Sequence, residues 1–232
     1  MTKWMDRVLL RERRTKSAYG RPTGFRPYFW LALALGLALA ASASARPLRL
    51  VALGDSLTAG YALPADAAFP AQLQRALRTK GFDVEIANAG VSGDTSSGAL
   101  ERLAWALGEG GDGVLVEIGA NDMLRGTDPA LTRKNIEAIL ARLQQRKIPA
   151  LLVGMRAAPN LGPEYAQQFD PIYPDLAKKY DSAFYPFFLE GVAGHPERQL
   201  PDGMHPNREG VAIIVAGILP EVAAWLERLQ KN

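Results

Sequence analysis

The strongest constraint on the fold is an alternation that starts after residue 46, where short apolar runs take turns with longer runs of helical period. Five runs are typical of strands: 48–54, 82–90, 113–119, 148–155 and 182–188. Five others have helical spacing: 66–81, 94–110, 128–147, 162–181 and 206–230. A chain that repeats strand and helix in this way forms a parallel sheet covered by helices on both faces. The sequence therefore predicts a single α/β domain over 46–232, with no internal repeat and no linker.

Capping residues and prolines refine the helical runs. Asp128, followed directly by a proline, is a typical helix start with the aspartate as N-cap. Pro171 and Pro174 are expected to disturb the helix over 162–181, and Pro220 is expected to kink the last helix. The second half of the helical layer is therefore predicted to be irregular.

The first 45 residues have the three parts of a secretory signal peptide. Basic residues come first, an apolar run follows over 28–43, and small residues stand at Ala43 and Ala45. We expect cleavage after Ala45, which leaves 46–232 in the periplasm of a bacterium or outside the cell. The alternative is an uncleaved N-terminal anchor, although the apolar run is short for a membrane span. After cleavage no stable membrane span is expected.

The formal net charge of +3 comes from this leader. Residues 1–45 carry eight Lys and Arg against two acidic residues, so the rest of the chain has 19 basic and 22 acidic residues. A basic surface for nucleic acid is therefore not expected. The sequence has no cysteine, which excludes disulfides and a lipid anchor on cysteine. The stability of an exported chain of this kind depends on its hydrophobic core.

Four polar, glycine-containing segments interrupt the apolar pattern. Three follow the first three strands and the fourth precedes the last helix: 54–56, 88–96, 119–126 and 200–207. Right-handed crossovers bring the carboxyl ends of parallel strands to one edge of the sheet, which is where ligands bind. The fourth segment can reach the same edge. The four segments are therefore predicted to form one site.

These segments supply one candidate for each part of a serine hydrolase site. Ser56, at a strand-to-helix turn, is the candidate nucleophile. His205 is the candidate base, and Asp202, three residues earlier, can hold its imidazole. The backbone N–H groups of Ser56 and Gly93 and the side-chain amide of Asn121 are candidate donors to an oxyanion. This set of residues implies no cofactor and no metal ion.

The same segments resemble a known family. Four segments are similar, in order, to the four blocks of the GDSL or SGNH hydrolases: GDSLTAGY, NAGVSGDTSSGALERL, GANDMLRG and DGMHPN. FDPIYPDLAKKYD and PFFLEGV resemble the bacterial periplasmic thioesterase I branch, whose members also act as arylesterases and lysophospholipases. The resemblance covers nearly all of 47–230 and implies a three-layer α/β/α sandwich with a flavodoxin-like, five-stranded parallel sheet. It also implies Ser56 as nucleophile, the Asp202 and His205 pair, and an oxyanion hole with Gly93 and Asn121.

Residues and resemblance together predict serine-dependent hydrolysis of carboxylic esters and thioesters through an acyl-enzyme. The expected substrates are small acyl esters, thioesters or lysophospholipids. Loops over 155–165 and 187–201 are expected to line the acyl pocket, and the apolar character of the first favours a chain over an acetyl group. Phe187 and Phe188 fit either the core or the pocket wall. The sequence does not indicate an oligomeric state.

Three other functions compete with this prediction. A carbohydrate O-acetylesterase would use the same fold and the same catalytic residues. A lipid-binding carrier would have the fold without turnover. A metal-dependent phosphoesterase is disfavoured because two histidines in the whole chain are too few ligands.

Other polar residues of these segments have simpler structural interpretations. Asp55 is expected to brace its turn, Asp94 to cap a helix and Asp122 to brace a loop. His195, the only other histidine, is expected in a solvated loop. Ser92 lies in GVSGD, which resembles the nucleophile elbow of α/β-hydrolases, but an aspartate stands where that motif requires its last glycine.

Overall fold

The computed structural model describes residues 46–108 and 110–231. The predictions for 1–45, a signal peptide cleaved after Ala45 or a retained anchor, lie outside the described residues. Arg46–Asn232 is one compact unit that contains every strand and helix named below. This unit contains an extensive hydrophobic core of its own, so we expect 46–232 to fold on its own.

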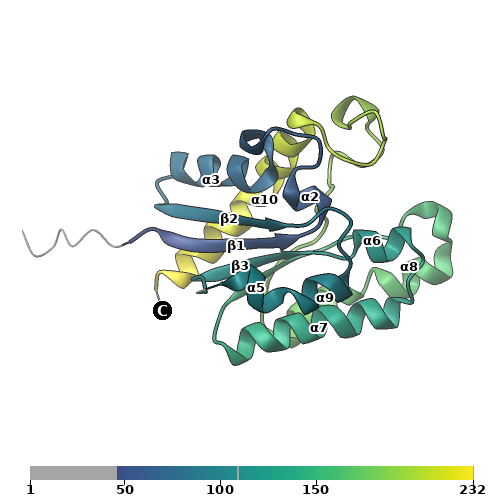
Figure 1. Ribbon diagram of the computed structural model, residues 1–232, viewed down its shortest axis with the longest axis horizontal. Helices are drawn as coiled ribbons and strands as arrows, with labels where there is room; N and C mark the ends of the chain where they lie inside the picture. Colours follow the sequence, from purple (N-terminus) through teal and green to yellow (C-terminus); the bar gives the residue numbers. More distant parts are fainter. Residues whose placement is uncertain (1–45, 109, 232) are drawn as a thin grey trace, which may run out of the picture. The chain divides into compact units, whose positions relative to one another are not determined.

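Five parallel strands form one sheet in the order β2-β1-β3-β4-β5 (Figure 1). They are β1 (Leu48–Gly54), β2 (Val84–Gly90), β3 (Gly113–Glu117), β4 (Ala150–Val153) and β5 (Ala183–Tyr185). The side chains of β3 are buried throughout and those of β1 are buried from its third residue, as expected for central strands covered on both faces. The predicted five-stranded parallel sheet is confirmed, although β5 is shorter than the run that predicted it.

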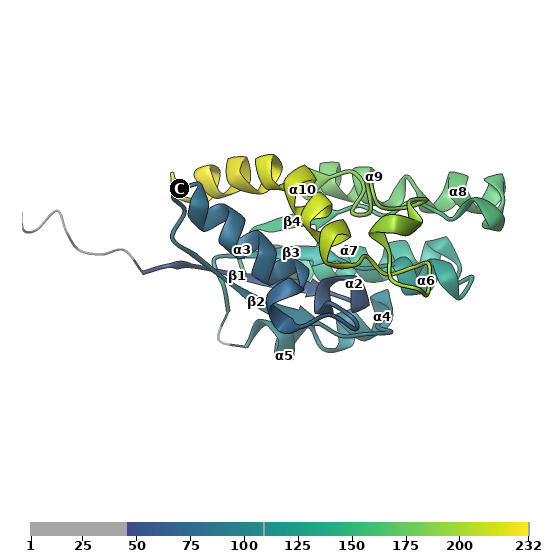
Figure 2. The same cartoon turned by 90° about the horizontal axis from the view of Figure 1, so that it is seen from above.

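Helices cover both faces of the sheet (Figure 2). On one face α3 (Phe69–Thr79) packs against α10 (Arg208–Leu229), and on the other lie α4 (Ser96–Glu101), α5 (Leu103–Leu107) and α7 (Pro129–Gln145). Shorter helices are α2 (Ser56–Ala59), α6 (Ala120–Leu124), α8 (Pro163–Phe169) and α9 (Ile172–Lys179). Three 3-10 turns complete the fold: η1 (Ala65–Ala67), η2 (Pro159–Leu161) and η3 (Pro196–Arg198). The architecture is the predicted three-layer sandwich.

Three of the predicted helices are divided. The run over 66–81 is η1 followed by α3, and the run over 94–110 is α4 followed by α5. The run over 162–181 breaks at Pro171, as its prolines predicted. Pro174 lies in the first turn of α9, where a missing N–H costs nothing, so it does not break that helix.

One predicted cap is wrong and another is confirmed. Asp94 does not cap α4; Thr95 does, because its hydroxyl accepts a backbone N–H in the first turn. The Asp94 carboxylate instead forms an ion pair with Arg102 at 2.6 Å. Asp128 caps α7 as predicted, because its side chain accepts the N–H of Ala130 at 2.9 Å.

α10 is long and apolar enough to cross a membrane by length and composition. It runs through Pro220 as one helix. Its apolar side chains recur every three or four residues and are buried in the core: Val211, Ile214, Ile218, Val222 and Leu226. This burial explains the apolar composition of α10 as that of a core helix.

Candidate active site

The polar segments after β1, β2 and β3 and the segment before α10 meet at one pocket. From β1 the chain passes to β2 on one side and then to β3 on the other, so β1 and β3 enclose the topological switch point of the sheet. Ser56 follows β1 and Asn121 follows β3, and both line the pocket. The pocket therefore lies where a doubly wound sheet binds its ligand.

The Ser56 turn is a four-residue helix that begins directly after β1. Asp55 caps it, because its Oδ1 accepts the N–H of Leu57 at 2.9 Å. A Cβ on Gly54 would clash with the side chain of Thr58, so a glycine is needed where the helix folds back on the strand. Ser56 is the first residue of the helix, and its own N–H has no intrahelical acceptor. The turn therefore supplies a hydroxyl group and a backbone donor at one residue.

Ser56, His205 and Asp202 form a continuous hydrogen-bonded chain. His205 Nε2 lies 2.8 Å from Ser56 Oγ, and its Nδ1 lies 2.7 Å from Asp202 Oδ2. Asp202 Oδ1 accepts the backbone N–H groups of His205 and Met204 at 3.0 and 2.9 Å. These donors lower the pKa of Asp202 to about 2. Because Asp202 is ionised at neutral pH, His205 Nδ1 is the donor and Nε2 is left to accept from the serine.

Gly93 and Asn121 line the same pocket as Ser56. Gly93 has a φ of 81°, a conformation that strains any residue with a Cβ. Its carbonyl accepts a hydrogen bond from Arg125 at 2.7 Å, which holds the loop between β2 and α4. Asn121 Nδ2 donates to Asp55 Oδ2 at 3.2 Å, and this nitrogen carries a second hydrogen. The residues predicted for the site are thus brought together, and their catalytic roles stay predictions.

Two carboxyl groups are buried in contact with the Ser56 turn. Glu117, the last residue of β3, is 1% exposed, and its Oε2 accepts the Thr58 hydroxyl at 2.7 Å. Within 46–108 and 110–231, Glu117 Oε1 is the only buried side-chain nitrogen or oxygen without a hydrogen-bond partner. Burial raises the pKa of Glu117 well above its ordinary value and raises the pKa of Asp55 to about 6. Both groups therefore retain protons at pH values where Asp202 is ionised.

The pocket around Ser56 has a volume of about 580 Å³. Large apolar side chains form much of its wall: Leu57, Met123, Leu124, Met155, Leu189 and Met204. The two loops predicted to line the pocket do so, the first through Met155, Ala158 and Pro159 and the second through Leu189, Ala193, Gly194 and Gln199. The site thus joins a polar serine–histidine centre to an apolar chamber.

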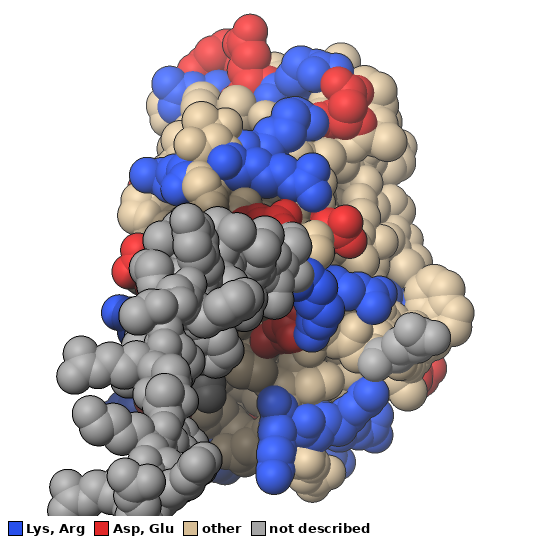
Figure 3. Space-filling view, turned by 90° about the vertical axis from the view of Figure 1, so that its left-hand side faces the viewer, with Lys and Arg blue, Asp and Glu red and all other residues tan. Residues whose placement is uncertain are grey.

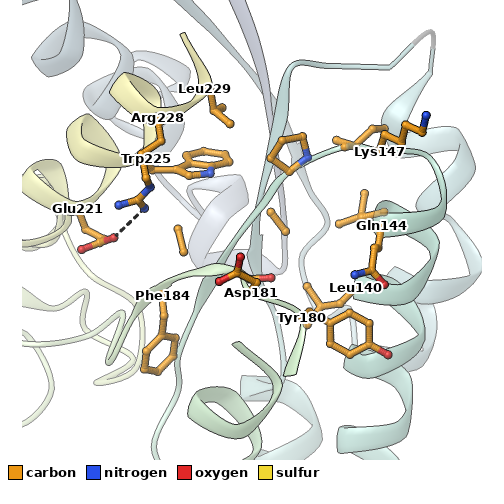
Figure 4. Close-up of a pocket in the computed structure, with 16 residues that line it drawn as sticks. Leu140, Gln144, Lys147, Tyr180, Asp181, Phe184, Glu221, Trp225, Arg228 and Leu229 are labelled. Atoms are coloured by element: carbon orange, nitrogen blue, oxygen red, sulfur yellow. Dashed lines mark ion pairs between the residues drawn. The ribbon is translucent and has the colours of Figure 1, made fainter. Parts of the chain in front are cut away.

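A larger cavity, of about 730 Å³, lies beside the starts of β4 and β5 (Figure 4). Its walls come from α7, α10 and the segment that leads into β5, and an ion pair joins Glu221 to Arg228 at 3.6 Å. Neither histidine of the chain lines it. The cavity therefore has no imidazole to activate a serine, and the smaller pocket, where His205 meets Ser56, is the candidate active site.

Lys and Arg side chains gather in clusters at the end of the molecule where the strands begin (Figure 3). Acidic side chains lie between these clusters, and Arg46 is paired with Asp112 at 2.7 Å. The mixture of charges fits the slightly acidic balance of 46–232. The expectation that this protein does not bind nucleic acid stays a prediction.

Two residues that the sequence analysis did not single out support the site. The Tyr61 ring lies against the His205 imidazole, with ring centroids 4.5 Å apart. Arg102 donates to the carbonyl oxygens of Gly54 and Ala89 at 2.9 and 2.8 Å, which ties together the ends of β1 and β2. Tyr61 lies within GDSLTAGY, so its place near Ser56 was indicated, but its contact with a distant histidine was not.

The remaining polar residues have structural roles. Asp122 is 1% exposed and accepts both the N–H and the hydroxyl of Ser96, so it links α6 to α4 as a brace. His195 lies in a loop, is about half exposed and pairs with Glu197, as expected of a solvated residue. Ser92 lines the pocket, but His205 bonds to Ser56 instead.

Phe187 and Phe188, which fit either the core or the pocket wall by sequence, both lie outside the pocket wall. Phe188 is fully buried and packs edge-to-face on Phe69 in the core. Phe187 lies under the guanidinium of Arg156, 4.7 Å from ring centroid to carbon. Neither ring lines the pocket around Ser56.

In the described part of the chain, no three His, Asp or Glu residues are grouped so that they could hold a metal ion. The carboxylates near Ser56 already have other partners: Asp55 binds the turn, and Asp202 binds His205. The donor set therefore gives no support to a metal-dependent phosphoesterase.

The chain is similar to known esterases in sequence and in structure. The GDSL-like lipase/acylhydrolase family profile matches residues 52–213. An arylesterase of Vibrio mimicus is 37% identical over 179 residues, which is 77% of this chain and 90% of that protein. Thioesterase 1/protease 1/lysophospholipase L1 of Escherichia coli K12 is 39% identical over 180 residues, 77% of this chain and 81% of that protein. The crystal structure of AlinE4, an SGNH-hydrolase family esterase, matches with a TM-score of 0.67 and 46% identity, covering 79% of this chain and 99% of that chain.

Proposed function

The chain belongs to the GDSL-like lipase/acylhydrolase family, and from that premise we propose which of its residues carry out the reaction and which esters it cleaves. The protein is a serine ester hydrolase with the SGNH-hydrolase fold. One observation carries the assignment of residues: the hydrogen-bonded chain from Asp202 through His205 to Ser56. The substrate assignment is supported by the apolar wall of the pocket.

Ser56 Oγ is the nucleophile in this proposal. As Oγ attacks the carbonyl carbon of the ester, its proton passes to His205 Nε2, which lies 2.8 Å away. The Asp202 carboxylate stabilises the imidazolium that forms. His205 then gives the proton to the leaving alcohol or thiol as the C–O or C–S bond breaks. A water molecule, deprotonated by His205 in turn, releases the acid from the acyl-enzyme.

The negative charge that develops on the carbonyl oxygen requires hydrogen-bond donors. We assign this role to the backbone N–H groups of Ser56 and Gly93 and to Asn121 Nδ2, whose residues all line the pocket. Asn121 uses one amide hydrogen to bond Asp55, which leaves the other for the oxyanion. A single donor of this kind lowers the activation free energy by about 3 kcal/mol.

The acyl group is a medium or long alkyl chain. A chamber of about 580 Å³ with walls of leucine and methionine takes such a chain, whereas an acetyl group would leave most of these side chains without contact. Aryl esters, thioesters and lysophospholipids all satisfy this requirement. The printed names of the relatives include an arylesterase and a thioesterase and lysophospholipase, which supports the same range.

Hydrolysis of p-nitrophenyl esters from acetate to palmitate by residues 46–232 tests both assignments. We expect maximal kcat/KM at medium or long chains and a loss of at least about 10⁴-fold in the Ser56→Ala variant. Activity confined to acetate would favour the O-acetylesterase. Binding of fatty acids without turnover would favour the carrier, and normal activity of Ser56→Ala would refute the nucleophile.

A long-chain alkyl fluorophosphonate tests the nucleophile without turnover. The serine oxygen attacks phosphorus, fluoride leaves, and a stable phosphonyl ester remains. Mass spectrometry of peptides is expected to find the label on Ser56, and not on Ser92, which lines the same pocket. Labelling is also expected to be lost in His205→Ala. Label on Ser92 would overturn the assignment.

Export is the last part of the proposal. The order of basic, apolar and small residues over 1–45 supports a cleaved signal peptide. Outside the cytoplasm, lysophospholipids and other esters would be the substrates rather than coenzyme A thioesters. N-terminal sequencing of the protein recovered from the periplasm of bacteria that express the full chain is expected to begin at Arg46. An intact N-terminus in the membrane fraction would support the anchor instead.

A further inference from the structure

Exposed apolar side chains gather at the opening of the Ser56 pocket. In the described part of the chain six large apolar side chains are at least 41% exposed: Tyr61, Val91, Trp105, Leu124, Leu131 and Met204. Tyr61, Leu124 and Met204 line the pocket, and a lining side chain that is about half exposed lies at its opening. Val91 stands next to Ser92, which also lines the pocket. We call Tyr61, Val91, Leu124 and Met204 the mouth patch.

The mouth patch is assembled by the fold from four separate segments. Tyr61 follows α2, Val91 follows β2, Leu124 ends α6, and Met204 lies between η3 and α10. Single exposed apolar side chains are ordinary on a protein surface, but a group of them around one opening marks an interaction site. The patch surrounds a pocket whose inner wall is also apolar, so one apolar surface continues from the outside of the molecule toward Ser56.

We propose that the mouth patch docks the protein on the surface of a lipid bilayer, so that an acyl substrate passes from the bilayer into the Ser56 pocket without crossing water. This inference rests on the proposed function, because the path ends at Ser56. A folded protein partner on the mouth patch would close the opening. A fluid lipid surface instead covers the exposed side chains and supplies substrate through the same opening.

The charges near the opening indicate what kind of bilayer is required. On the two loops that line the pocket, Arg156 is paired with Glu190 at 3.6 Å and Arg198 with Glu197 at 3.4 Å. The guanidinium of Arg125 donates to a backbone carbonyl of the pocket wall. These cations already have partners, so insertion of apolar side chains supplies the binding free energy. Zwitterionic lipid is therefore sufficient.

The molecule carries its own control for this inference. Trp105, 75% exposed, is the most exposed large apolar residue among those that the structure describes, and it lies on α5. Figure 1 shows α5 away from the carboxyl ends of the strands, whereas α6, which carries Leu124, lies beyond those ends. If apolar exposure alone caused lipid binding, removal of Trp105 would weaken it as much as removal of Leu124.

Sedimentation with phosphatidylcholine vesicles tests the docking. The parent is residues 46–232 with Ser56→Ala, so the vesicles are not hydrolysed and the apolar leader does not bind them. We expect the added pair Leu124→Ser and Met204→Ser to lower the partition coefficient by about tenfold or more, and Trp105→Ser to leave it unchanged. Thermal melting checks that each variant is folded.

A fluorescence measurement covers the case in which the double variant does not fold. Leu124→Trp keeps an apolar side chain in the mouth patch, and its emission is expected to shift to shorter wavelength when vesicles are added. The parent, whose exposed tryptophan is Trp105, is expected to show no such shift.

Four results would overturn the docking: no binding of the parent, equal loss in Trp105→Ser, binding only to anionic vesicles, or a dimer that the serine substitutions dissociate. The dimer would assign the mouth patch to a second copy of the chain. Because the parent is inactive, failure of the docking leaves the esterase assignment untouched. Patch-dependent binding together with an unlabelled Ser56 would refute only the catalytic assignment.

Discussion

Asp202, in the loop before α10, and Glu117, buried at the end of β3, both support the site around Ser56, but they differ in charge. Asp202 has a side chain 30% exposed to solvent and accepts two backbone N–H groups and an imidazole, which lowers its pKa to about 2. Glu117 is buried with one unpartnered oxygen, and burial raises its pKa. The number of donors and the access of water, rather than nearness to the serine, decide the charge of each group.

The difference separates two kinds of support. Ionised Asp202 orients His205 and stabilises the imidazolium during the reaction. Glu117 acts on the backbone, because its carboxyl group holds Thr58 in the helix that starts at Ser56. Replacing Asp202 by asparagine should therefore remove most of the activity, whereas replacing Glu117 by glutamine should leave activity nearly unchanged, and both substitutions should change stability little.

Asp202→Asn should give the largest effect. The amide would offer an N–H to His205 Nδ1 and favour the wrong tautomer, so we expect kcat to fall by about 10³- to 10⁴-fold. The melting temperature should change by only a few degrees, because the side chain is partly solvated. Steady-state kinetics with a p-nitrophenyl ester and thermal melting measure the two. A loss of less than tenfold would mean that His205 does not depend on Asp202.

Glu117→Ala should have the next largest effect, which is a loss of stability and not of catalysis. The substitution leaves a cavity and a buried Thr58 hydroxyl without its acceptor, at a cost of about 3 kcal/mol in the free energy of unfolding. Urea denaturation measures this cost. In a double-mutant cycle, Thr58→Val combined with Glu117→Ala should cost less than the sum of the two, because both partners of the hydrogen bond are then gone. Strict additivity would contradict the contact.

The raised pKa of Asp55 should appear as pH-dependent stability. The folded state holds this proton up to pH about 6, whereas the unfolded chain releases it near its ordinary value of 3.8. Asp55 therefore stabilises the fold at low pH, and this contribution is lost as pH rises through about 6. Between pH 4 and pH 7 the free energy of unfolding of the wild type should fall by on the order of 2 kcal/mol relative to that of Asp55→Asn. Urea denaturation at several pH values in that range measures this change. A difference between the two proteins that stays constant with pH would refute the raised pKa.

Glu117→Gln should have the smallest effect and is the matched partner of Asp202→Asn. If Glu117 is already neutral, a carboxamide that still accepts from Thr58 should change the free energy of unfolding by less than about 1 kcal/mol. The kcat should stay within about threefold. A loss of activity as large as that of Asp202→Asn would show that Glu117 works as an anion.

Much of the site could be predicted because its parts are local. Asp202 and His205 are three positions apart, so the four-residue segment DGMH contains both the imidazole and the carboxylate that orients it. The Ser56 turn is likewise indicated by a strand pattern that ends in a glycine and a capping aspartate. The error at Asp94 was also local: two adjacent residues can cap a helix, and only its ion pair with Arg102 decided which one does.

The sequence by itself determined how strands and helices follow one another along the chain, and with that the parallel sheet. It also indicated the residues of the candidate site. These features could be predicted because periodicity, capping and the polar segments are each expressed within a few residues. The tertiary structure decided the rest. The contact between Ser56 and His205 joins residues 149 apart in the sequence. Tyr61 contacts the same histidine only because the fold brings two distant segments together. The charge of Glu117 and the composition of the mouth patch were decided in the same way. Desolvation and exposure depend on what distant segments place around a side chain, and no local pattern contains that information.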